Sequence, residues 1–110
     1  MILAMVRVHV PQKKNKEVAQ TIRGVLEPTR VEPGCLAIRC SRDIEDENVL
    51  VIEEEWATRE DWERHVRSEG YKVTLSFLEL ASTQPDMRYY EVTEAEGIEK
   101  ILKMRGSCPY

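Results

Sequence analysis

Apolar and polar residues alternate along the first ten positions of the chain. One face of the resulting strand would carry Ile2, Ala4, Val6, Val8 and Val10, and the other Leu3, Met5, Arg7 and His9. A period of two is typical of a β-strand. Pro11 ends the pattern because proline cannot donate a hydrogen bond to a sheet. The sequence therefore predicts a strand over 2–10 with one apolar and one mixed face.

The spacing of apolar residues becomes helical from about residue 13. One side of an amphipathic helix of about four turns would carry Val18, Ala19, Ile22, Val25 and Leu26. Because Pro28 cannot lie deep inside a helix, we expect the helix to loosen near 26–27. The sequence Val-Glu-Pro-Gly at 31–34 is typical of a turn.

Two further strands are predicted on either side of a polar loop. They span about 35–42 and 49–56. The loop over 42–48 lacks the spacing and the mid-loop glycine of a calcium-binding EF-hand, so it is interpreted as a hairpin connection. In the second strand, one face would carry Leu50, Ile52 and Trp56, and the other Val49, Val51, Glu53 and Glu55.

The second half of the chain is predicted to contain helices and one more strand. Thr58 and Asp61 have the spacing of a capping box at a helix start, and Gly70 ends that helix. A second helical segment follows at about 71–82, and 87–92 has the pattern of a strand. A short helix in the tail is predicted by the spacing of Ile98, Ile101 and Leu102.

The order of these elements, β-α-β-β-α-β, is that of the ferredoxin-like split β-α-β fold, which belongs to the α+β class. Right-handed crossovers place both helical segments on one face of a four-stranded antiparallel sheet. The other face would expose apolar side chains, and a second copy of the same sheet is their simplest cover. We therefore expect a domain over 1–92 that pairs through its sheet faces into a homodimeric α/β barrel, followed by a helical tail over 93–110.

Composition and charge limit the kinds of molecule that the protein is expected to bind. The 110 residues are 42% hydrophobic and 33% charged, with a net charge of −4, which is ordinary for a globular domain and argues against nucleic-acid binding. The densest basic run, Lys-Lys-Asn-Lys at 13–16, is better explained by a solvated helix end than by a phosphate-binding patch. No apolar run approaches the ~20 residues that span a bilayer, and no signal peptide is recognisable, so we expect a cytoplasmic protein without a membrane partner.

The three cysteines, Cys35, Cys40 and Cys108, match no zinc-binding spacing. Cys35 and Cys40 are five residues apart on one predicted strand, so they would point to opposite faces and could not form a local disulfide. We expect free thiols that pack as small hydrophobic side chains, and no metal site.

The segment 32–68 resembles the antibiotic biosynthesis monooxygenase domain of the dimeric α/β-barrel group. The resemblance rests on Pro33-Gly34-Cys35-Leu36 at a strand start, Arg42-Asp43 at its end, Glu54-x-Trp56 at the end of the next strand, and Thr58-Arg59-Glu60 and His65 on the helix. It extends over roughly 2–92 and implies the fold and the dimer derived above.

Characterised members of this family oxidise phenols or quinols with O2 and use neither flavin nor metal. The resemblance thus implies a cofactor-independent monooxygenase acting on a quinol or phenolic small molecule. One branch degrades haem with an asparagine on the first strand and a late histidine, and this chain has neither, since no histidine follows His65. It also has Ser68-Glu69-Gly70-Tyr71 where the family often has His-Phe after the serine. The alternative function is a non-catalytic small-molecule-binding or interaction module on the same barrel.

His65 matches the family's helix histidine and is the candidate catalytic residue, because an imidazole can accept a phenol proton. The alternative is a histidine at the edge of the core that donates one N–H to a neighbour. The candidate substrate-binding residues could hold a flat ring or simply fill the core, and they are Trp56, Trp62, Tyr71 and Phe77.

The three consecutive glutamates at 53–55 do not make a catalytic pair of neighbours, because adjacent strand residues point to opposite faces. Glu53 and Glu55 share a face. Salt bridges from them to Arg7 or Arg39 on other strands are favoured over a cation site.

Overall fold

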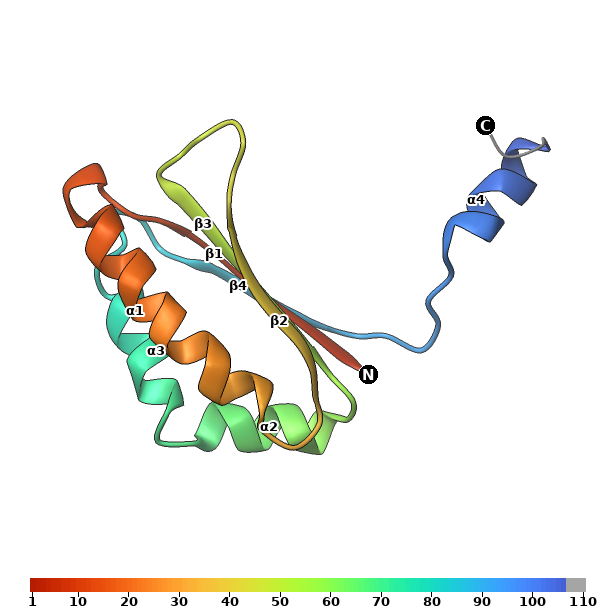
Figure 1. The fold of residues 1–110 in the computed structure, drawn as a ribbon, viewed down its shortest axis with the longest axis horizontal. Helices are drawn as coiled ribbons and strands as arrows, with labels where there is room; N and C mark the ends of the chain where they lie inside the picture. The colour runs from red at the N-terminus through yellow and green to blue at the C-terminus, as the bar shows by residue number, and fades with distance from the viewer. Residues whose placement is uncertain (107–110) are drawn as a thin grey trace.

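The computed structural model describes residues 1–106, which build a four-stranded antiparallel sheet with helices on one side (Figure 1). The strands are β1 (Ile2–His9), β2 (Cys35–Arg42), β3 (Val49–Trp56) and β4 (Asp86–Glu91). The helices are α1 (Gln12–Arg30), α2 (Arg59–Arg67), α3 (Tyr71–Leu78) and α4 (Ile98–Arg105). The strand order β2-β3-β1-β4 is that of the α+β ferredoxin-like fold, which confirms the predicted class.

The pairing of the strands fixes which residues share a face of the sheet. Across β1, β3 and β4, Ala4 lies opposite both Glu54 and Tyr89. The same face carries Val6, which is buried under the helices, so all of these side chains belong to the helix side of the sheet. The predicted alternation of the first strand is therefore confirmed.

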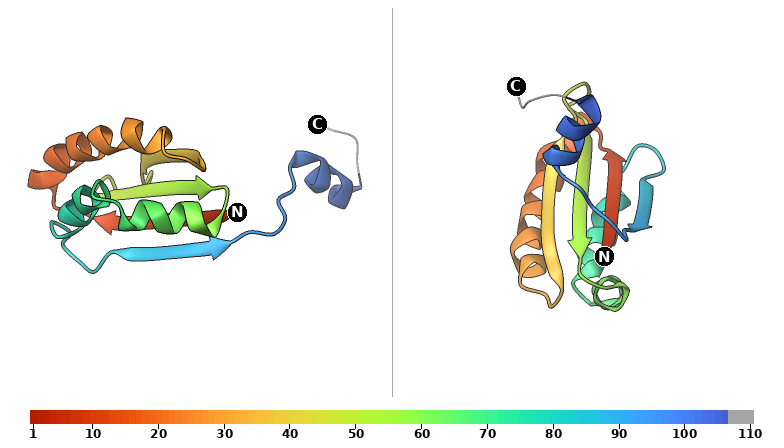
Figure 2. Two further views of the ribbon diagram at one scale, coloured as in Figure 1. Left: turned by 90° about the horizontal axis from the view of Figure 1, so that it is seen from below. Right: turned by 90° about the vertical axis from the view of Figure 1, so that its right-hand side faces the viewer.

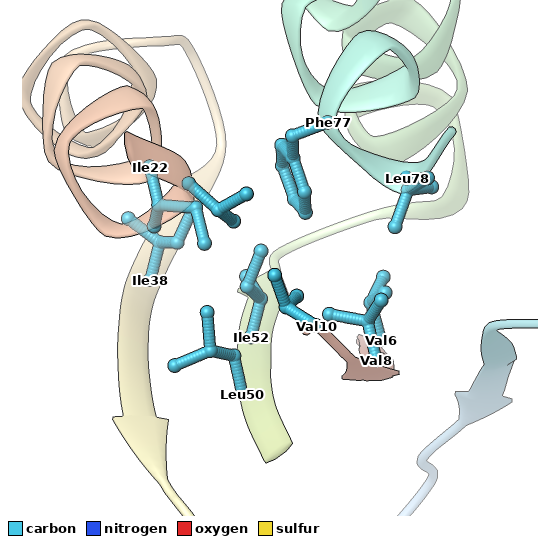
Figure 3. Packing of buried hydrophobic residues seen from close by; sticks show 10 residues of the cluster. Val6, Val8, Val10, Ile22, Ile38, Leu50, Ile52, Phe77 and Leu78 are labelled. Atoms are coloured by element: carbon cyan, nitrogen blue, oxygen red, sulfur yellow. The ribbon is translucent and has the colours of Figure 1, made fainter. Parts of the chain in front are cut away.

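The hydrophobic core lies between the sheet and the helices α1 and α3 (Figure 3). Its buried members are Val6, Val8, Val10, Val18, Ile22, Ile38, Leu50, Ile52, Phe77 and Leu78. Each such side chain contributes about 1.5–3 kcal/mol when it is fully buried. Phe77, for which substrate contact was expected, points into this core and is 2% exposed.

Helix α1 continues past 26–27, where it was expected to loosen, and includes Pro28 before it ends at Arg30. The last turn has contacts of its own. Thr29 is buried and its hydroxyl donates to the Val25 carbonyl at 2.8 Å, and Arg30 pairs with Glu27 at 2.6 Å. These contacts offset the hydrogen bond that proline cannot make near a helix end.

Helix α3 is shorter than its apolar pattern predicted and ends at Leu78 rather than 82. The chain leaves the helix because Ser82 is bound to the end of β1. The Ser82 N–H donates to the His9 carbonyl at 2.9 Å, and its hydroxyl lies 2.5 Å from His9 Nδ1. Tertiary contacts thus decide where this helix ends.

A β-bulge between Cys35 and Ala37 changes the faces of the cysteines. Cys35 pairs with Trp56 and Cys40 with Ile52, which both lie on the helix side of β3. The expectation of opposite faces is therefore wrong, because the extra residue of the bulge shifts the alternation by one. Both thiols are free and partly buried, and burial raises the pKa of each. Cys108 lies outside the described residues.

The opposite face of the sheet has no covering element within residues 1–106 (Figures 1 and 2). Arg39 on this face pairs with Glu53 at 3.6 Å and with Glu55 at 2.9 Å, as predicted. Arg7 instead pairs with Asp43 at 2.7 Å. The face also carries apolar side chains, and these are Leu3, Met5, Val51 and Tyr90.

Helix α4 lies apart from the rest of the domain at the end of an extended segment (Figure 1). Its apolar side chains Ile98, Ile101 and Met104 are exposed. Among the described helices, none is both long and apolar enough to cross a bilayer.

Candidate active site

A cavity of about 330 Å³ lies between the helices α2 and α3 and the strands β1 and β4. It is lined by Ala4, Met5, Val6, Glu54, Trp62, Val66, Tyr71, Leu75, Met87, Arg88 and Tyr89. The strand register places the side chains of Met5 and Arg88 on the opposite face of the sheet, so Glu54 is the charged side chain on the cavity side. The rings of Trp62 and Tyr89 pack against each other with centroids 4.4 Å apart. Small-molecule sites have volumes of about 300–1,000 Å³, so this mostly apolar cavity has room for a small ligand.

Glu54 is the only carboxylate that lines the cavity among residues 1–106. It lies between Ile52 and Trp56 on the helix side of β3 and is 7% exposed. The indole N–H of Trp56 donates to Glu54 Oε1 at 2.9 Å, and His65 Nε2 lies 3.5 Å from the same oxygen. Both contacts go to Oε1, so within the described chain Oε2 is left without a partner. Glu54 can therefore accept a hydrogen bond from a ligand.

His65 does not line the cavity but lies behind Glu54, 3% exposed and between two carboxylates. Its Nδ1 is 2.9 Å from Glu32 Oε2, and its Nε2 faces Glu54. The imidazole ring stacks on Trp56 with centroids 4.7 Å apart and meets the edge of Tyr71 at 5.2 Å. These contacts fix the ring in position on all sides.

The pKa of His65 is set by burial and by the two carboxylates. Burial is the largest single influence and lowers it, but the hydrogen bonds and charges of Glu54 and Glu32 together outweigh burial and raise the pKa above its ordinary value. In the protonated imidazole both nitrogens donate, one to each carboxylate. Glu32, His65 and Glu54 thus form a buried charge relay that reaches from a partly exposed turn to the cavity wall.

Tyr71 is the second titratable side chain on the cavity wall close to Glu54. Burial, followed by the negative charge of Glu54, raises the pKa of its phenol. The hydroxyl of Tyr71 therefore stays protonated and can act as a hydrogen-bond donor.

The local sequence explains how the relay is assembled. Helix α2 begins at its cap Thr58, whose hydroxyl oxygen accepts from the Asp61 N–H at 3.1 Å, so the predicted capping interaction is confirmed. The turn that carries Glu32 packs against this first helical turn at Gly34, which has φ +82°. A Cβ added at Gly34 would lie 2.1 Å from the Asp61 carboxylate. Glycine thus permits the close approach that brings Glu32 to His65.

The predicted site residues fall into three layers. Trp62 and Tyr71 line the cavity. Trp56, which is fully buried, and His65 lie in the layer behind it, and Phe77 belongs to the core. Trp56 and Phe77 do not line this cavity.

The sequence interpretation missed Glu54 and Glu32. A signal for Glu54 was present, because it is a single carboxylate between Ile52 and Trp56 on an otherwise apolar strand face. For Glu32 there was none. Its partner His65 is 33 positions away in the sequence and reaches it only through the fold.

A comparison with protein families finds that the model described as "Antibiotic biosynthesis monooxygenase" matches residues 1–76. No match to the sequence was found among curated proteins.

Several solved structures resemble this chain. A Deinococcus radiodurans protein with the same family description has a TM-score of 0.81 at 21% identity, over 88% of this chain and 97% of that one. A conserved protein of Methanosarcina mazei has a TM-score of 0.77 at 22% identity, over 81% and 89%. A Nitrosomonas europaea protein with the family description has a TM-score of 0.77 at 19% identity, over 86% and 100%. At such identities these similarities establish the fold alone.

Proposed function

Because the chain belongs to the antibiotic biosynthesis monooxygenase family, we propose that it oxidises a quinol or phenolic molecule with O2 in the cavity beside Glu54, with no flavin or metal. One observation carries the proposal: the single carboxylate on the wall of an apolar, aromatic-lined cavity is backed by a buried histidine. Such a wall can bind a flat ring and take the proton of its hydroxyl group.

The aromatic side chains would hold the substrate ring. Trp62, Tyr71 and Tyr89 offer flat faces and edges on the cavity wall. The Tyr71 hydroxyl can donate a hydrogen bond to a substrate oxygen. A substrate whose polar end is its hydroxyl group would then place that group toward Glu54.

In this proposal the proton of the substrate hydroxyl passes to Glu54 and ends on His65. The predicted role of His65 as the direct base is revised, because His65 does not touch the cavity. When the imidazole is neutral, the Glu54–His65 pair takes up the hydroxyl proton as a unit, leaving a phenolate and an imidazolium that Glu32 stabilises. Because the raised pKa of His65 lies closer to that of a phenol, the transfer is less unfavourable than to an ordinary imidazole.

The phenolate then reduces O2. One oxygen atom forms a new bond to a ring carbon and the other leaves as water, while the substrate supplies all the electrons and loses the corresponding hydrogens.

Glu54→Gln should lower the rate of O2 consumption by roughly 10²-fold or more, the usual contribution of a general base. The matched control is Glu53→Gln, which removes the same charge from the opposite face of the sheet and should retain the wild-type rate. O2 consumption would be measured with a panel of hydroquinones and naphthols. Failure of the wild type to consume O2 above the blank, or equal rates in Glu54→Gln and wild type, would contradict the proposal.

The pH profile separates proton uptake by His65 from a purely structural role. In the wild type kcat should rise with pH through the raised pKa of His65, since only the neutral imidazole can take up the proton. His65→Gln should lose this limb while still binding the substrate. A profile unchanged by His65→Gln would exclude the relay.

A non-catalytic ligand-binding protein is the second candidate, favoured by the small polar inventory of the cavity. Among the described residues that line it, charged and hydroxyl side-chain groups on the cavity side come only from Glu54, Tyr71 and Tyr89, since Arg88 pairs with Met5 on the opposite face of the sheet and bonds to Asp86. Quenching of Trp62 fluorescence by the same phenols, with no O2 consumption, would support this function over the enzyme.

We further propose that two copies pair through the sheet face that lacks helices, as the predicted barrel requires. The support is the apolar set on this face, interrupted by ion pairs. Tyr90, which lies on it and is 45% exposed, is a suitable test position. Sedimentation should give twice the 12.8 kDa chain mass, and Tyr90→Asp should shift the protein toward monomer. A wild-type mass of one chain at micromolar concentration would contradict the dimer.

A further inference from the structure

A second hollow, of about 430 Å³, lies between α1 and the hairpin that joins β2 to β3. We call it the basic groove, and the residues on which its character depends are Gln12, Asn15, Lys16, Arg23, Arg42 and Glu47. The helical residues lie at a spacing that puts them along one side of α1. Arg42 belongs to the helix side of β2, where it pairs with Leu50. The groove is therefore separate from the uncovered sheet face and from the cavity beside Glu54.

The cations of the basic groove lack carboxylate partners. Within the described chain none of Lys16, Arg23 and Arg42 forms an ion pair, and Glu47 is the only acidic residue on the wall. Elsewhere in the described chain, by contrast, nine lysines and arginines form ion pairs. An excess of positive charge thus gathers here in a protein whose net charge is −4.

The start of α1 adds to this positive potential. Its cap residue is Pro11, which offers no side-chain acceptor, and the first turn contains no acidic residue. Gln12, the first residue of this 19-residue helix, lies on the groove wall. The free N–H groups and the positive end of the helix dipole favour an anion at this position.

Asn15 supplies an independent indication of a ligand. It is 9% exposed, and its Oδ1 accepts a hydrogen bond from Arg42 Nη1, which also donates to the Glu47 carbonyl at 3.0 Å. This contact fixes the orientation of the amide and leaves Nδ2 as a buried donor with no acceptor among residues 1–106. A buried donor without a partner costs about 1–3 kcal/mol, and an acceptor atom in the groove would remove that cost.

We propose that the basic groove binds a small molecule through a carboxylate or phosphate group. Arg42 is held in place by Asn15 and Glu47 through Nη1, so the other side of its guanidinium stays available for two parallel hydrogen bonds to an oxyanion. Lys16 and Arg23 add charge on the helix side, and Asn15 Nδ2 adds a neutral donor. The proposal does not depend on the monooxygenase activity.

The groove also changes the interpretation of the basic run at 13–16. The sequence favoured a solvated helix end over a phosphate-binding patch, because the run is short and lies at a predicted helix start. The structure brings Asn15 of this run to Arg42, 27 positions later, and places Lys16 beside them. Asn15 and Lys16 of the basic run thus belong to the helix wall of a site whose other wall comes from the hairpin.

Titration of the full-length protein with inorganic phosphate, and separately with succinate, followed by amide NMR, tests the site. The expected result is a saturable shift of the Asn15 side-chain amide and the Gln12 backbone amide by at least one of the two probes. Arg23→Gln and Arg42→Gln should each weaken binding about tenfold, the loss expected for one charge-assisted hydrogen bond. Arg67→Gln, which removes the same charge from a side chain 76% exposed on α2, should bind as the wild type does.

Sodium chloride at the same ionic strength is the reference for simple screening. Saturation by phosphate alone or by succinate alone supports the site and selects between the two ligand classes. The proposal is overturned if neither probe saturates, if chloride produces the same shifts, or if Arg67→Gln weakens binding as much as Arg23→Gln. Arg23→Gln is the decisive variant because Arg23, unlike Arg42, makes no hydrogen bond to the described protein whose loss could disturb the fold.

Discussion

The cavity beside Glu54 and the basic groove lie on the same side of the sheet, yet they use charge in opposite ways. Behind the cavity, the carboxylates of Glu54 and Glu32 enclose His65, so each buried charge has a partner. In the groove, Arg23 and Arg42 face no carboxylate of their own. The two carboxylates raise the pKa of the imidazole between them and hold it in a fixed arrangement, whereas unpaired charges at a surface hollow remain free for a ligand. Stability should therefore depend on the first set, and ligand binding on the second.

The largest effect on stability is expected from His65→Leu. The change leaves Glu54 and Glu32 without their cation, and breaking a buried ion pair from one side costs about 3–5 kcal/mol. The double variant His65→Leu with Glu54→Leu should recover a large part of that loss, because it removes the buried charge as well. Urea unfolding would measure both. A loss below 1 kcal/mol in the single variant would show that the pair is not buried in solution.

The pH dependence of stability is the next largest expected effect. The folded protein holds the His65 proton more tightly than the unfolded chain does, so this proton stabilises the fold below the ordinary pKa of 6.5, and its contribution is lost as pH rises through the raised pKa. Each unit of difference corresponds to about 1.4 kcal/mol. The free energy of unfolding should therefore fall as pH rises from 6.5 through the raised pKa of His65. His65→Gln should reduce the change of the unfolding free energy with pH. An equal change in both proteins would mean that other groups cause it.

A smaller effect is expected on the cavity wall. Trp62→Ala removes the ring that packs on Tyr89 at 4.4 Å and should raise KM or the ligand Kd about tenfold, with little change in the pKa of His65. The control is Phe77→Leu, which alters the core and not the wall and should leave ligand affinity unchanged. An equal loss of affinity in both variants would mean that Trp62 acts through general stability.

The smallest effect on stability is expected in the basic groove. Arg23→Gln should change the free energy of unfolding by no more than about 0.5 kcal/mol, because it removes an exposed charge that has no partner. Thermal unfolding at low ionic strength would measure this. A loss of unfolding free energy as large as that of His65→Leu would contradict the difference between the cavity and the basic groove.

The fold was predictable from the sequence because periodicity reports burial directly. The strands 35–42 and 49–56 and the cap at Thr58 followed from local patterns, as did the strand order from the sequence of elements. The errors arose where distant contacts decide. Ser82 ends α3 by bonding to β1, and one extra residue at the β2 bulge returned both cysteines to one face.

The candidate site was predictable only in part, for the same reason. Trp62 and Tyr71 could be expected near a pocket because they lie on amphipathic helices beside a histidine. The chemistry of His65 depends on Glu32 and Glu54. Glu32 lies in a turn that is distant in sequence, and Glu54 was interpreted as one of three charges at the end of a strand. No local pattern distinguishes a carboxylate that faces solvent from one that faces a buried imidazole.

The most direct test of this account is the pKa of His65 itself, measured by NMR titration of its ring carbon resonance, with His65→Gln used to assign the signal. The account predicts a value above 6.5 in the wild type and a lower one in Glu54→Gln, because the carboxylate that most favours the charged ring is then gone. Glu53→Gln should leave the value unchanged. A wild-type pKa at or below 6.5 would mean that burial outweighs both carboxylates and that no charge relay stands behind the cavity.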